Sequence, residues 1–542
     1  MKKIKSLSTV STIGVVATLV PSLATACSYS NNQVEHTSVY WKTPKIANTI
    51  YCINGTDLST AMRITIESLQ GILAQTEARI FIYSGDQDRD NWLYDMQAIY
   101  GFITKDISDP WQLINMYRNE FGSKYIYYTA QTENNHDNSV NYAATLAGVQ
   151  KHILIEKSLV TKAQSYGYKQ AEDATSYSII NLIGQYGHIL TPTMLINQKP
   201  TEIGLRDYAI ASKSMCSYLE YEDESEKELV TQWLRSNAAV LGWNDDELNF
   251  VKWLSEQNLV ALASNHCVNL SLYSVYNPKC VYKQKRRSKK IIPDKNKHYV
   301  ALVMSDGDNL QWMQGSFKSS DWFGSKYRGQ FPMSWTISPS TYDLNATALD
   351  YYYEKMSDND YFITSPSGYA YRNLGDCKNN NYFTETSLKY MHDTDQHVIN
   401  FLDWYTCTKP EEFTGFMQSD QVKGAVWSEN QLYLSGGGEV YWINDKPIIS
   451  MRDGLWDRSE GDLRVAETAK RVNAYPCDPY KIDGYTVLIC GCWVEGKMDK
   501  VKEFVDLLDD HVELVTADQL IDMVIENVPH EYAKPEHHSP IG

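Results

Sequence analysis

The sequence predicts an α/β protein with a C-terminal (β/α)8-like barrel of the TIM type, or a seven-stranded variant of it, preceded by two or three small α/β domains. The 542-residue chain is too long for one ordinary core. Strand-like and helical stretches alternate about eight times over 297–528, close to the length of such a barrel. A basic stretch over 281–296 separates this region from a less regular α/β alternation before it.

Residues 1–27 resemble a signal peptide, with three lysines before an apolar run that ends at residue 23. The following Ala-Thr-Ala suits an ordinary signal peptidase, whereas Cys27 directly after it is typical of a lipobox. We expect lipid attachment at Cys27, because the polar residues 28–36 would then serve as a tether. The prediction is an exported bacterial lipoprotein, on the cell surface or in the periplasm, that reaches the membrane only through this anchor.

The next part of the chain predicts three small α/β domains, over 40–108, 109–188 and 189–280. Strands and helices alternate here without a single period. The predicted strands are 48–53, 78–83, 124–129 and 238–242, and the predicted helices are 58–74, 110–121, 171–184, 225–235 and 245–257. Nothing in these residues indicates chemistry, so we expect the domains to brace the barrel or to extend its groove.

The stretch 281–296 predicts a solvated linker, with contact to an anionic polymer as the alternative. Beyond it, the barrel region over 297–528 predicts eight strands. They are 299–304, 331–337, 361–364, 398–402, 422–427, 447–451, 485–490 and 511–515, with helices at 342–356, 383–393, 461–473, 498–508 and 517–528. A glycine run and the strand-like residues 440–443 make the fifth unit irregular, which leaves the seven-stranded variant open.

The run from Tyr299 to Asn309 is the strongest indication of chemistry. Five apolar residues predict a buried strand, and the strand ends at Asp306, Asp308 and Asn309. Carboxylates at the mouth of a buried strand cost desolvation free energy unless they bind something or do chemistry. They could share a proton, bind a hard cation or cap the next helix, but capping explains only one of the two acids. We therefore predict a functional role for the acidic pair.

Most of the other strand ends place an acid or an amide near an aromatic ring, and active sites of such barrels lie at these carboxyl ends. Acids beside flat rings suit sugars, whose CH faces stack on rings and whose hydroxyls need charged hydrogen-bond partners. The aromatic content of 12% would follow equally from aromatic-rich cores. Asp403 is the second catalytic candidate. The predicted substrate-binding residues are Asn309, Trp312, Trp335, Tyr369, Tyr371, Trp404, Glu429, Arg452 and Glu495.

Composition and motifs exclude several other classes of protein. The net charge of −17 argues against nucleic acid as a partner. The sequence has no nucleophile elbow, no phosphate-binding loop and no HExxH metalloprotease motif. The spacing of His392 and His397 fits no familiar metal motif, so we expect no metal and no cofactor.

A family resemblance rests on three segments: Val303–Trp312, Pro332–Pro339 and Ser365–Tyr371. With them, the sequence resembles the GxGYxYP glycoside hydrolases, exported bacterial proteins with small N-terminal domains and a C-terminal catalytic-type domain. The naming motif is matched at Gly368, Tyr369 and Tyr371. It departs from the pattern where Pro366 replaces the first Gly and Arg372 replaces the final Pro. The resemblance implies hydrolysis of glycosidic bonds.

The leading hypothesis is therefore a surface-anchored glycoside hydrolase that acts on an oligo- or polysaccharide. Such an enzyme needs one acid and one carboxylate, with Asp306 or Asp308 in one role and Asp403 in the other. One alternative is a metal-dependent polysaccharide deacetylase-like enzyme, compatible with the acidic pair and with the closing segment 511–518. The other is a glycan-binding lipoprotein without catalysis, which the altered loop around Tyr369 would favour.

Overall fold

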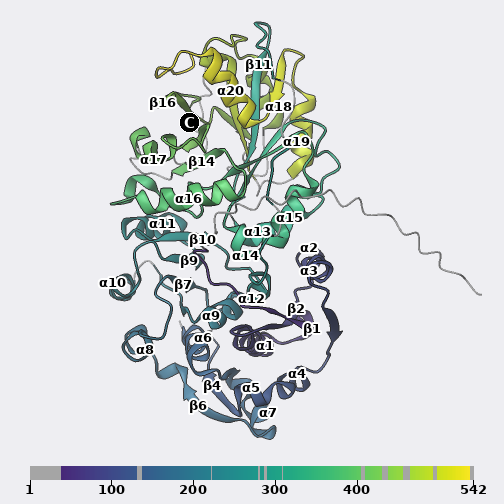
Figure 1. The fold of residues 1–542 in the computed structure, drawn as a ribbon, viewed down its shortest axis with the longest axis vertical. Helices are drawn as coiled ribbons and strands as arrows, with labels where there is room; N and C mark the ends of the chain where they lie inside the picture. Colours follow the sequence, from purple (N-terminus) through teal and green to yellow (C-terminus); the bar gives the residue numbers. More distant parts are fainter. Residues whose placement is uncertain are drawn as a thin grey trace, which may run out of the picture. The chain divides into compact units, whose positions relative to one another are not determined.

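Four sheets built mainly from parallel strands organise the chain in this computed structural model (Figure 1). Each sheet lies within one of the four predicted domain ranges. The predicted signal segment, including Cys27, lies outside the described residues, and none of the described helices is long and apolar enough to cross a membrane. The structure describes residues 38–130, 137–220, 223–278, 281–285, 290–307, 309–403, 409–429, 437–455, 464–491 and 497–536, with the backbone alone for Asp403 and Glu429.

The first sheet has the parallel strand order β2–β1–β3. The sequence predicted β1 and β2 but not β3. Helix α1 begins after Ser59, whose hydroxyl accepts a hydrogen bond from Met62 N at 3.3 Å. The hydroxyl of Thr65 on this helix donates to Leu154 O of the second sheet at 2.8 Å, so α1 joins the two sheets. The elements are β1 (Ile46–Asn54), α1 (Thr60–Ala74), β2 (Ala78–Tyr83), α2 (Gln87–Asp90), α3 (Trp92–Tyr100) and β3 (Ile103–Asp106).

The second sheet has the parallel order β5–β4–β6 and corrects one predicted helix. The stretch predicted as a helix over 171–184 is instead the end of a strand, a turn and a shorter helix. Asp173 ends the strand, because its carboxylate accepts from Thr175 N at 3.0 Å and so caps the turn. The elements are α4 (Pro110–Met116), α5 (Arg118–Phe121), β4 (Lys124–Tyr128), α6 (Ser139–Gln150), β5 (Ile153–Glu156), α7 (Val160–Ser165), β6 (Lys169–Asp173) and α8 (Ile179–Tyr186).

The third sheet has the parallel order β10–β9–β7–β8, with the predicted helix 245–257 present as α11. Asp246 caps α11 by accepting from Asn249 N at 3.2 Å. β9 and β10 lie side by side, so their carboxyl ends share one edge of this sheet. The elements are β7 (Met194–Asn197), α9 (Arg206–Ser212), β8 (Met215–Ser217), α10 (Glu224–Trp233), β9 (Ala239–Gly242), α11 (Glu247–Glu256), β10 (Val260–Ala263) and α12 (Leu270–Tyr273).

The fourth sheet contains all eight strands predicted beyond residue 297, and β16 and β18 in addition. Its strands are β11 (His298–Met304), β12 (Met333–Ile337), β13 (Asp360–Thr364), β14 (Val398–Asp403), β15 (Gly424–Glu429), β16 (Val440–Ile443), β17 (Lys446–Ser450), β18 (Asp453–Leu455), β19 (Tyr485–Cys490) and β20 (Val512–Val515). Its helices are α13 (Leu310–Gln314), α14 (Thr341–Leu344), α15 (Ala346–Lys355), α16 (Asn381–Asp393), α17 (Thr414–Met417), α18 (Val465–Asn473), α19 (Lys497–Asp506) and α20 (Ala517–Asn527).

This sheet is strongly curled. The strand order is β16–β17–β15–β14–β13–β12–β11–β19–β18, parallel except for β16. β17 and β18 follow one another in the chain but pair with opposite ends of the order: Met451 N donates to Trp427 O of β15, and Arg452 N donates to Val487 O of β19. The predicted eighth strand, β20, pairs with the first half of β11. These pairings establish a mixed α/β fold with a curled, mostly parallel sheet, and they do not confirm a TIM barrel.

Residues 281–285 of the predicted linker contact this sheet, whereas residues 290–296 are exposed or half-buried. Tyr282 and Gln284 are buried. The Gln284 side chain donates to Phe362 O at 2.5 Å and accepts from Phe362 N at 2.9 Å, so it takes both backbone groups of a residue in β13. Lys283 forms an ion pair with Asp395 at 3.1 Å. The segment before residue 286 is therefore attached to the sheet through Tyr282 and Gln284, while the side chains of Lys283 and Lys285 are exposed.

Candidate active site

β11 ends in a turn that leaves no room for a side chain at Gly307. Gly307 N donates to the hydroxyl of Thr336 on β12 at 2.8 Å, and Gly307 O accepts from Ser338 N at 3.1 Å. A Cβ atom at this position would lie 1.5 Å from the carbonyl oxygen of Thr336. Only glycine allows the turn to lie this close to β12, and the turn sets the position of Asp306.

We expect Gly307→Ala to lower the free energy of unfolding by more than about 3 kcal/mol, because the backbone of the turn must move away from β12. The measurement is urea unfolding followed by circular dichroism. The matched control is Gly184→Ala on α8, where a Cβ atom meets nothing within 4 Å. That change should raise stability by up to about 1 kcal/mol. Equal stability of the two variants would contradict the close approach at Gly307.

Asp306 has a left-handed backbone conformation, with φ of 59°. This region is uncommon for residues other than glycine, although aspartate tolerates it better than most, and such residues concentrate at functional sites. The hydroxyl of Ser305 donates to Asp306 Oδ2 at 2.5 Å. The turn thus directs the carboxylate of Asp306 into a cavity instead of along the strand.

Asn309 caps the helix that follows. It is the N-cap residue of α13, and its side-chain oxygen accepts from Trp312 N at 3.3 Å. This is the structural role that the sequence allowed for an acid or an amide at this position. Asn309 also lines the same cavity as Asp306. Asp308, between them in the chain, lies outside the described residues.

The cavity lies where the carboxyl ends of two parallel sheets meet. Its lining includes residues at or just after the carboxyl ends of β9 and β10 in the third sheet and of β11 and β14 in the curled sheet. Its volume is about 220 Å³. Polar groups gather at such strand ends in parallel α/β folds, and ligands bind there. The lining residues are Trp243, Glu247, Ala263, Asp306, Asn309, Tyr371 and Leu402.

Glu247 is the functional candidate that the sequence interpretation missed. It is the first residue of α11, directly after the capping residue Asp246, and it lines the cavity with Asp306. Burial, and next the charge of Asp306, raise the pKa of Glu247 to about 7. A large fraction of this carboxyl group is therefore protonated near neutral pH, beside another acidic residue. The sequence contained the pattern that pointed to Asp306, namely acids directly after a predicted strand. The predicted strand 238–242 is followed by Trp243-Asn-Asp-Asp-Glu247.

Tyr371 joins the two sheets at the cavity. Its backbone forms an antiparallel bridge with Ala261 of β10, through Tyr371 N to Ala261 O at 2.8 Å and the reverse bond at 2.9 Å. Its ring lies nearly parallel to that of Trp243, with an angle of 19° and centroids 6.4 Å apart. The next residue, Arg372, is buried and donates to Leu259 O at 3.2 Å. The motif loop therefore attaches the curled sheet to the third sheet.

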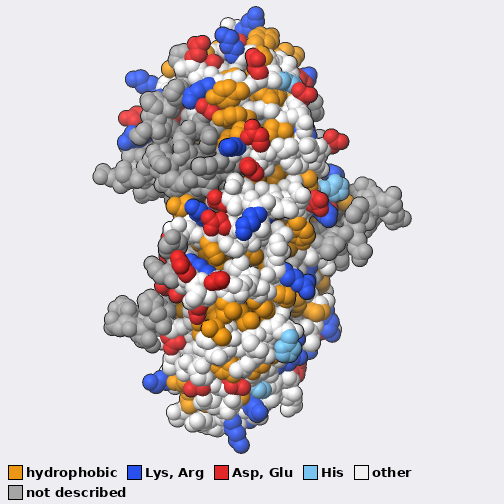
Figure 2. Space-filling view, turned by 90° about the vertical axis from the view of Figure 1, so that its left-hand side faces the viewer, with side chains coloured by type: hydrophobic (Ala, Val, Ile, Leu, Met, Phe, Trp, Pro, Cys, Tyr) orange, Lys and Arg blue, Asp and Glu red, His pale blue; other side chains and the backbone are white. Residues whose placement is uncertain are grey.

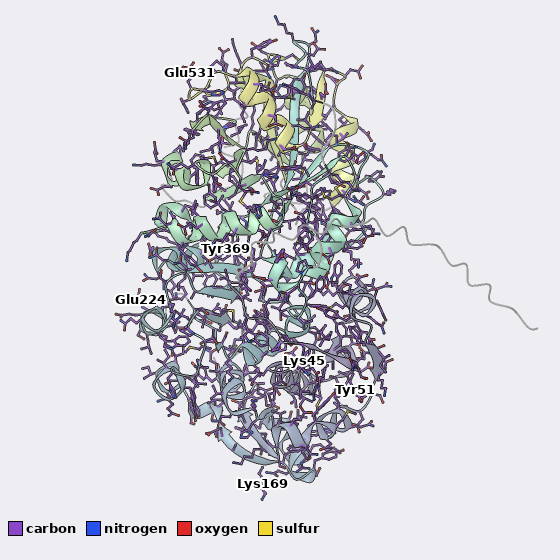
Figure 3. The ribbon with its side chains drawn as sticks, viewed as in Figure 1. Lys45, Tyr51, Lys169, Glu224, Tyr369 and Glu531 are labelled. Carbon is purple, nitrogen blue, oxygen red and sulfur yellow. The ribbon has the colours of Figure 1, made fainter. Side chains whose placement is uncertain are left out.

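Three aromatic residues predicted to bind sugar lie in the core instead. Trp312 packs against Phe317 with ring centroids 4.6 Å apart. Trp335 is fully buried, and its indole N–H donates to Asp360 Oδ1 at 2.8 Å. Tyr369, which is labelled in Figure 3, is stacked on Tyr390 of α16, with ring centroids 5.7 Å apart. None of the three lines the cavity, because their rings pack on other aromatic rings in the core.

Arg452, another residue predicted to bind substrate, also contacts the protein interior and does not line the cavity. Its guanidinium is buried and donates to Asp483 O and Tyr485 O, each at 2.8 Å. The backbones of Asp403 and Glu429 are register partners at the carboxyl ends of β14 and β15, and Leu402 beside Asp403 lines the cavity. The side chains of these two acids, and all of Trp404 and Glu495, lie outside the described residues.

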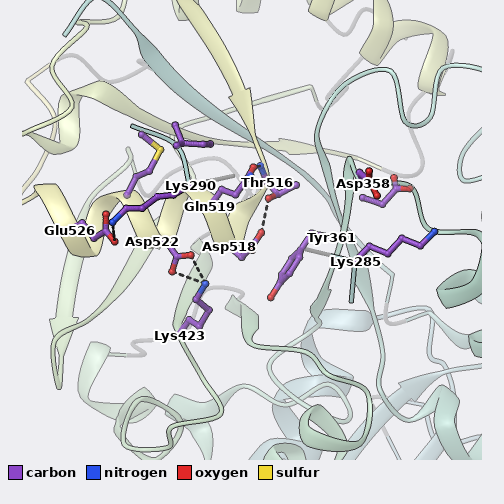
Figure 4. Close-up of a pocket in the computed structure, with 13 residues that line it drawn as sticks. Lys285, Lys290, Asp358, Tyr361, Lys423, Thr516, Asp518, Gln519, Asp522 and Glu526 are labelled. Carbon is purple, nitrogen blue, oxygen red and sulfur yellow. Dashed lines mark hydrogen bonds and ion pairs between the residues drawn. The ribbon is translucent and has the colours of Figure 1, made fainter. Parts of the chain in front are cut away.

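A larger cavity, of about 310 Å³, lies at the amino ends of β13 and β15 (Figure 4). Two ion pairs join charged groups of its lining: Lys423 pairs with Asp522 at 2.6 Å, and Lys290 pairs with Glu526 at 2.6 Å. Asp518 accepts from the hydroxyl of Thr516 at 2.6 Å. Because active sites of such folds lie at the carboxyl ends of the strands, this cavity indicates a structural role.

Within the described ranges, no three His, Cys, Asp or Glu side chains form a group that could hold a metal ion.

Comparisons with known proteins agree with this organisation. The model of the "GxGYxYP putative glycoside hydrolase C-terminal domain" matches residues 296–525. The models of the first and third GxGYxYP domains match 49–119 and 192–275. A crystal structure described as a "putative hydrolase" from Bacteroides thetaiotaomicron is similar, with a TM-score of 0.83 and 25% identity over 90% of this chain and 97% of that one. The comparison with curated proteins found no match.

Proposed function

Because the chain belongs to the GxGYxYP family, we propose that it is a glycoside hydrolase whose active site is the cavity shared by Asp306 and Glu247. The observation that carries this proposal is the raised pKa of Glu247, about 7, beside Asp306. Glycosidases need one protonated carboxyl group and one ionised carboxylate on either side of the scissile bond. Two acids whose pKa values are pushed apart by their surroundings are the usual sign of that division of roles.

In this proposal, Glu247 gives its proton to the glycosidic oxygen as the bond from that oxygen to the anomeric carbon breaks. Asp306 stabilises the positive charge that develops at the sugar ring. A water molecule then supplies the hydroxyl group that ends on the anomeric carbon, and its remaining proton returns to a carboxylate. Asp308 and Asp403 stay predicted members of the site, adjacent in the chain to Gly307 and Leu402.

The curled sheet supports a finer proposal for the fold, the seven-stranded (β/α) barrel. If β17 and β18 are counted as one bent strand, it pairs with β15 at one end and with β19 at the other, which closes a ring. β20 then lies outside the count, beside the start of β11. Such a ring turns the carboxyl ends of β11 and β14 to one side, where the cavity lies.

We also propose that the partner is a carbohydrate and not a nucleic acid. The chain carries a net charge of −17, and basic side chains are interspersed with acidic ones on the face drawn in Figure 2. A polyanion would find no continuous attraction on such a face. A neutral glycan is not repelled by the negative charge of the protein, and its hydroxyls can donate hydrogen bonds to the carboxylates of the cavity.

The experiment that tests the proposal is a screen for reducing sugar released from a panel of plant, microbial and host glycans. Wild-type protein is compared with Asp306→Asn and with Glu247→Gln. Release by the wild type and its loss in both variants is the expected result. Full activity in either variant would exclude that residue from catalysis.

The proposed lipid anchor has its own test. Expressed with its signal segment in a bacterium that processes lipoproteins, the wild type should be recovered in the membrane fraction, with mass spectrometry showing acyl chains on Cys27. Cys27→Ser should remove the modification and the membrane association together, whereas Cys477→Ser, on a half-buried residue, should change neither. An unmodified mature protein that begins after Ala26 would indicate ordinary signal peptidase cleavage.

A further inference from the structure

Resting on the proposed function, we infer that the enzyme is exo-acting and removes one neutral sugar at a time from the non-reducing end of its substrate. Three properties of the cavity carry this inference: its size, its aromatic wall and the charge of its lining. Both sheets supply the residues that set the specificity: Trp243 lies on the loop after β9 of the third sheet, and Tyr371 lies on the motif loop of the curled sheet.

The size of the cavity fits a single sugar ring. Its volume of about 220 Å³ is below the roughly 300–1,000 Å³ of sites that enclose drug-sized ligands. Asp306 and Glu247 both line this small space, so the anomeric carbon of the bound ring must lie within it. A ring held there has its glycosidic oxygen beside the acids, and a space of this volume holds one ring and not two. In the inferred mode of action, that ring is the non-reducing end of the chain.

The aromatic wall supplies the surface on which the ring can stack. Trp243 and Tyr371 line the cavity with their planes only 19° apart. Trp243 is held from behind by Phe250 of α11, edge to face, with centroids 5.8 Å apart. Tyr371 is fixed by its two backbone hydrogen bonds to Ala261. Flat rings held rigidly in this way bind the CH face of a sugar at little entropic cost.

The charge of the lining selects a neutral terminal sugar. The seven lining residues include two acids, Glu247 and Asp306, and one amide, Asn309, but no Lys, Arg or His within the described structure. A uronic acid or another sugar with a carboxylate would place like charges together in a small, partly buried space. Hydroxyl groups, by contrast, donate hydrogen bonds to the carboxylates.

Product analysis tests the mode of action. Neutral oligosaccharides of a glycan that the protein degrades, labelled with a fluorophore at the reducing end, are digested and sampled from the first per cent of conversion. We expect labelled products shorter by one residue at a time, together with free monosaccharide. A ladder of internal fragments at early times would overturn exo-action while the proposed hydrolase function stands. Absence of turnover on every glycan would instead overturn the proposed function itself.

A second assay tests the role of Trp243 and the charge selection. We expect 4-nitrophenyl glycosides of a neutral sugar to be hydrolysed and the corresponding glucuronide to react at least 100-fold more slowly. Trp243→Ala should raise KM for the neutral glycoside about tenfold or more, and Trp243→Phe should recover part of that loss. Trp253→Ala, on a ring of α11 that does not line the cavity, is the control and should leave KM unchanged. Equal KM values in all variants, or equal rates on both glycosides, would contradict the specificity inference.

Discussion

Replacing Asp306 by Asn is expected to lower kcat on an active glycan by at least about 1,000-fold, the loss expected when a carboxylate that acts in the transition state is removed. The amide has the same shape and can still accept from Ser305, so the turn after β11 should stay folded. It cannot stabilise positive charge at the sugar ring. The measurement is initial rates of sugar release at saturating substrate.

The control for this change is Asp509→Asn, on an exposed acid next to the start of β20, which should leave kcat unchanged. Asp306→Asn has a second expected effect, because the charge of Asp306 contributes to the raised pKa of Glu247. That pKa should fall in the variant, yet stay above the ordinary value, since burial is the larger cause. An Asp306→Asn protein with wild-type kcat would remove this residue from the mechanism.

Glu247→Gln is expected to lower kcat/KM by about 100- to 10,000-fold, which is the usual contribution of a general acid. Wild-type activity should also fall as the pH rises through about 7, because the carboxyl group then loses the proton that it must donate. The variant has no such proton to lose, so its residual activity should not show this limb. The measurement is a pH profile of kcat/KM from pH 4 to pH 9, with Glu256→Gln on the exposed side of α11 as the control.

The same substitution should stabilise the protein at high pH. The pKa of Glu247 is raised on folding, from its ordinary value of 4.5 to about 7, so the folded state binds the proton more tightly than the unfolded state. Stability is therefore lost as the pH rises from about 4.5 to 7, on the order of 2 kcal/mol once partial exposure is allowed for. Glu247→Gln should recover this amount at pH 8 and nothing at pH 4. A gain that is the same at both pH values would contradict the buried acid.

Strand positions were the most predictable feature of the fold. β2 and β19 have the predicted bounds, 78–83 and 485–490, because their mainly apolar stretches, each with one polar residue, end at turn-forming residues. Helix α6 was not predicted. Nearly all of its residues are buried, so it has no polar face and no helical period in its sequence. The predicted helix over 171–184 was wrong because a short local cap, at Asp173, decided where the strand ended.

The sequence by itself determined the family, the α/β class and the acidic end of β11, because these depend on residue type and on spacing along the chain. Only the tertiary structure decided which groups meet. Strand side chains alternate between two faces, and in β12 Trp335 alternates with Ser334 and Thr336. That alternation could not reveal that Trp335 packs on Phe317 and Phe323 instead of lining the cavity. Glu247 and Asp306 are about sixty positions apart, and they share a cavity because two separate sheets bring their carboxyl ends together. No local pattern encodes a meeting of that kind, since it arises from packing between distant segments.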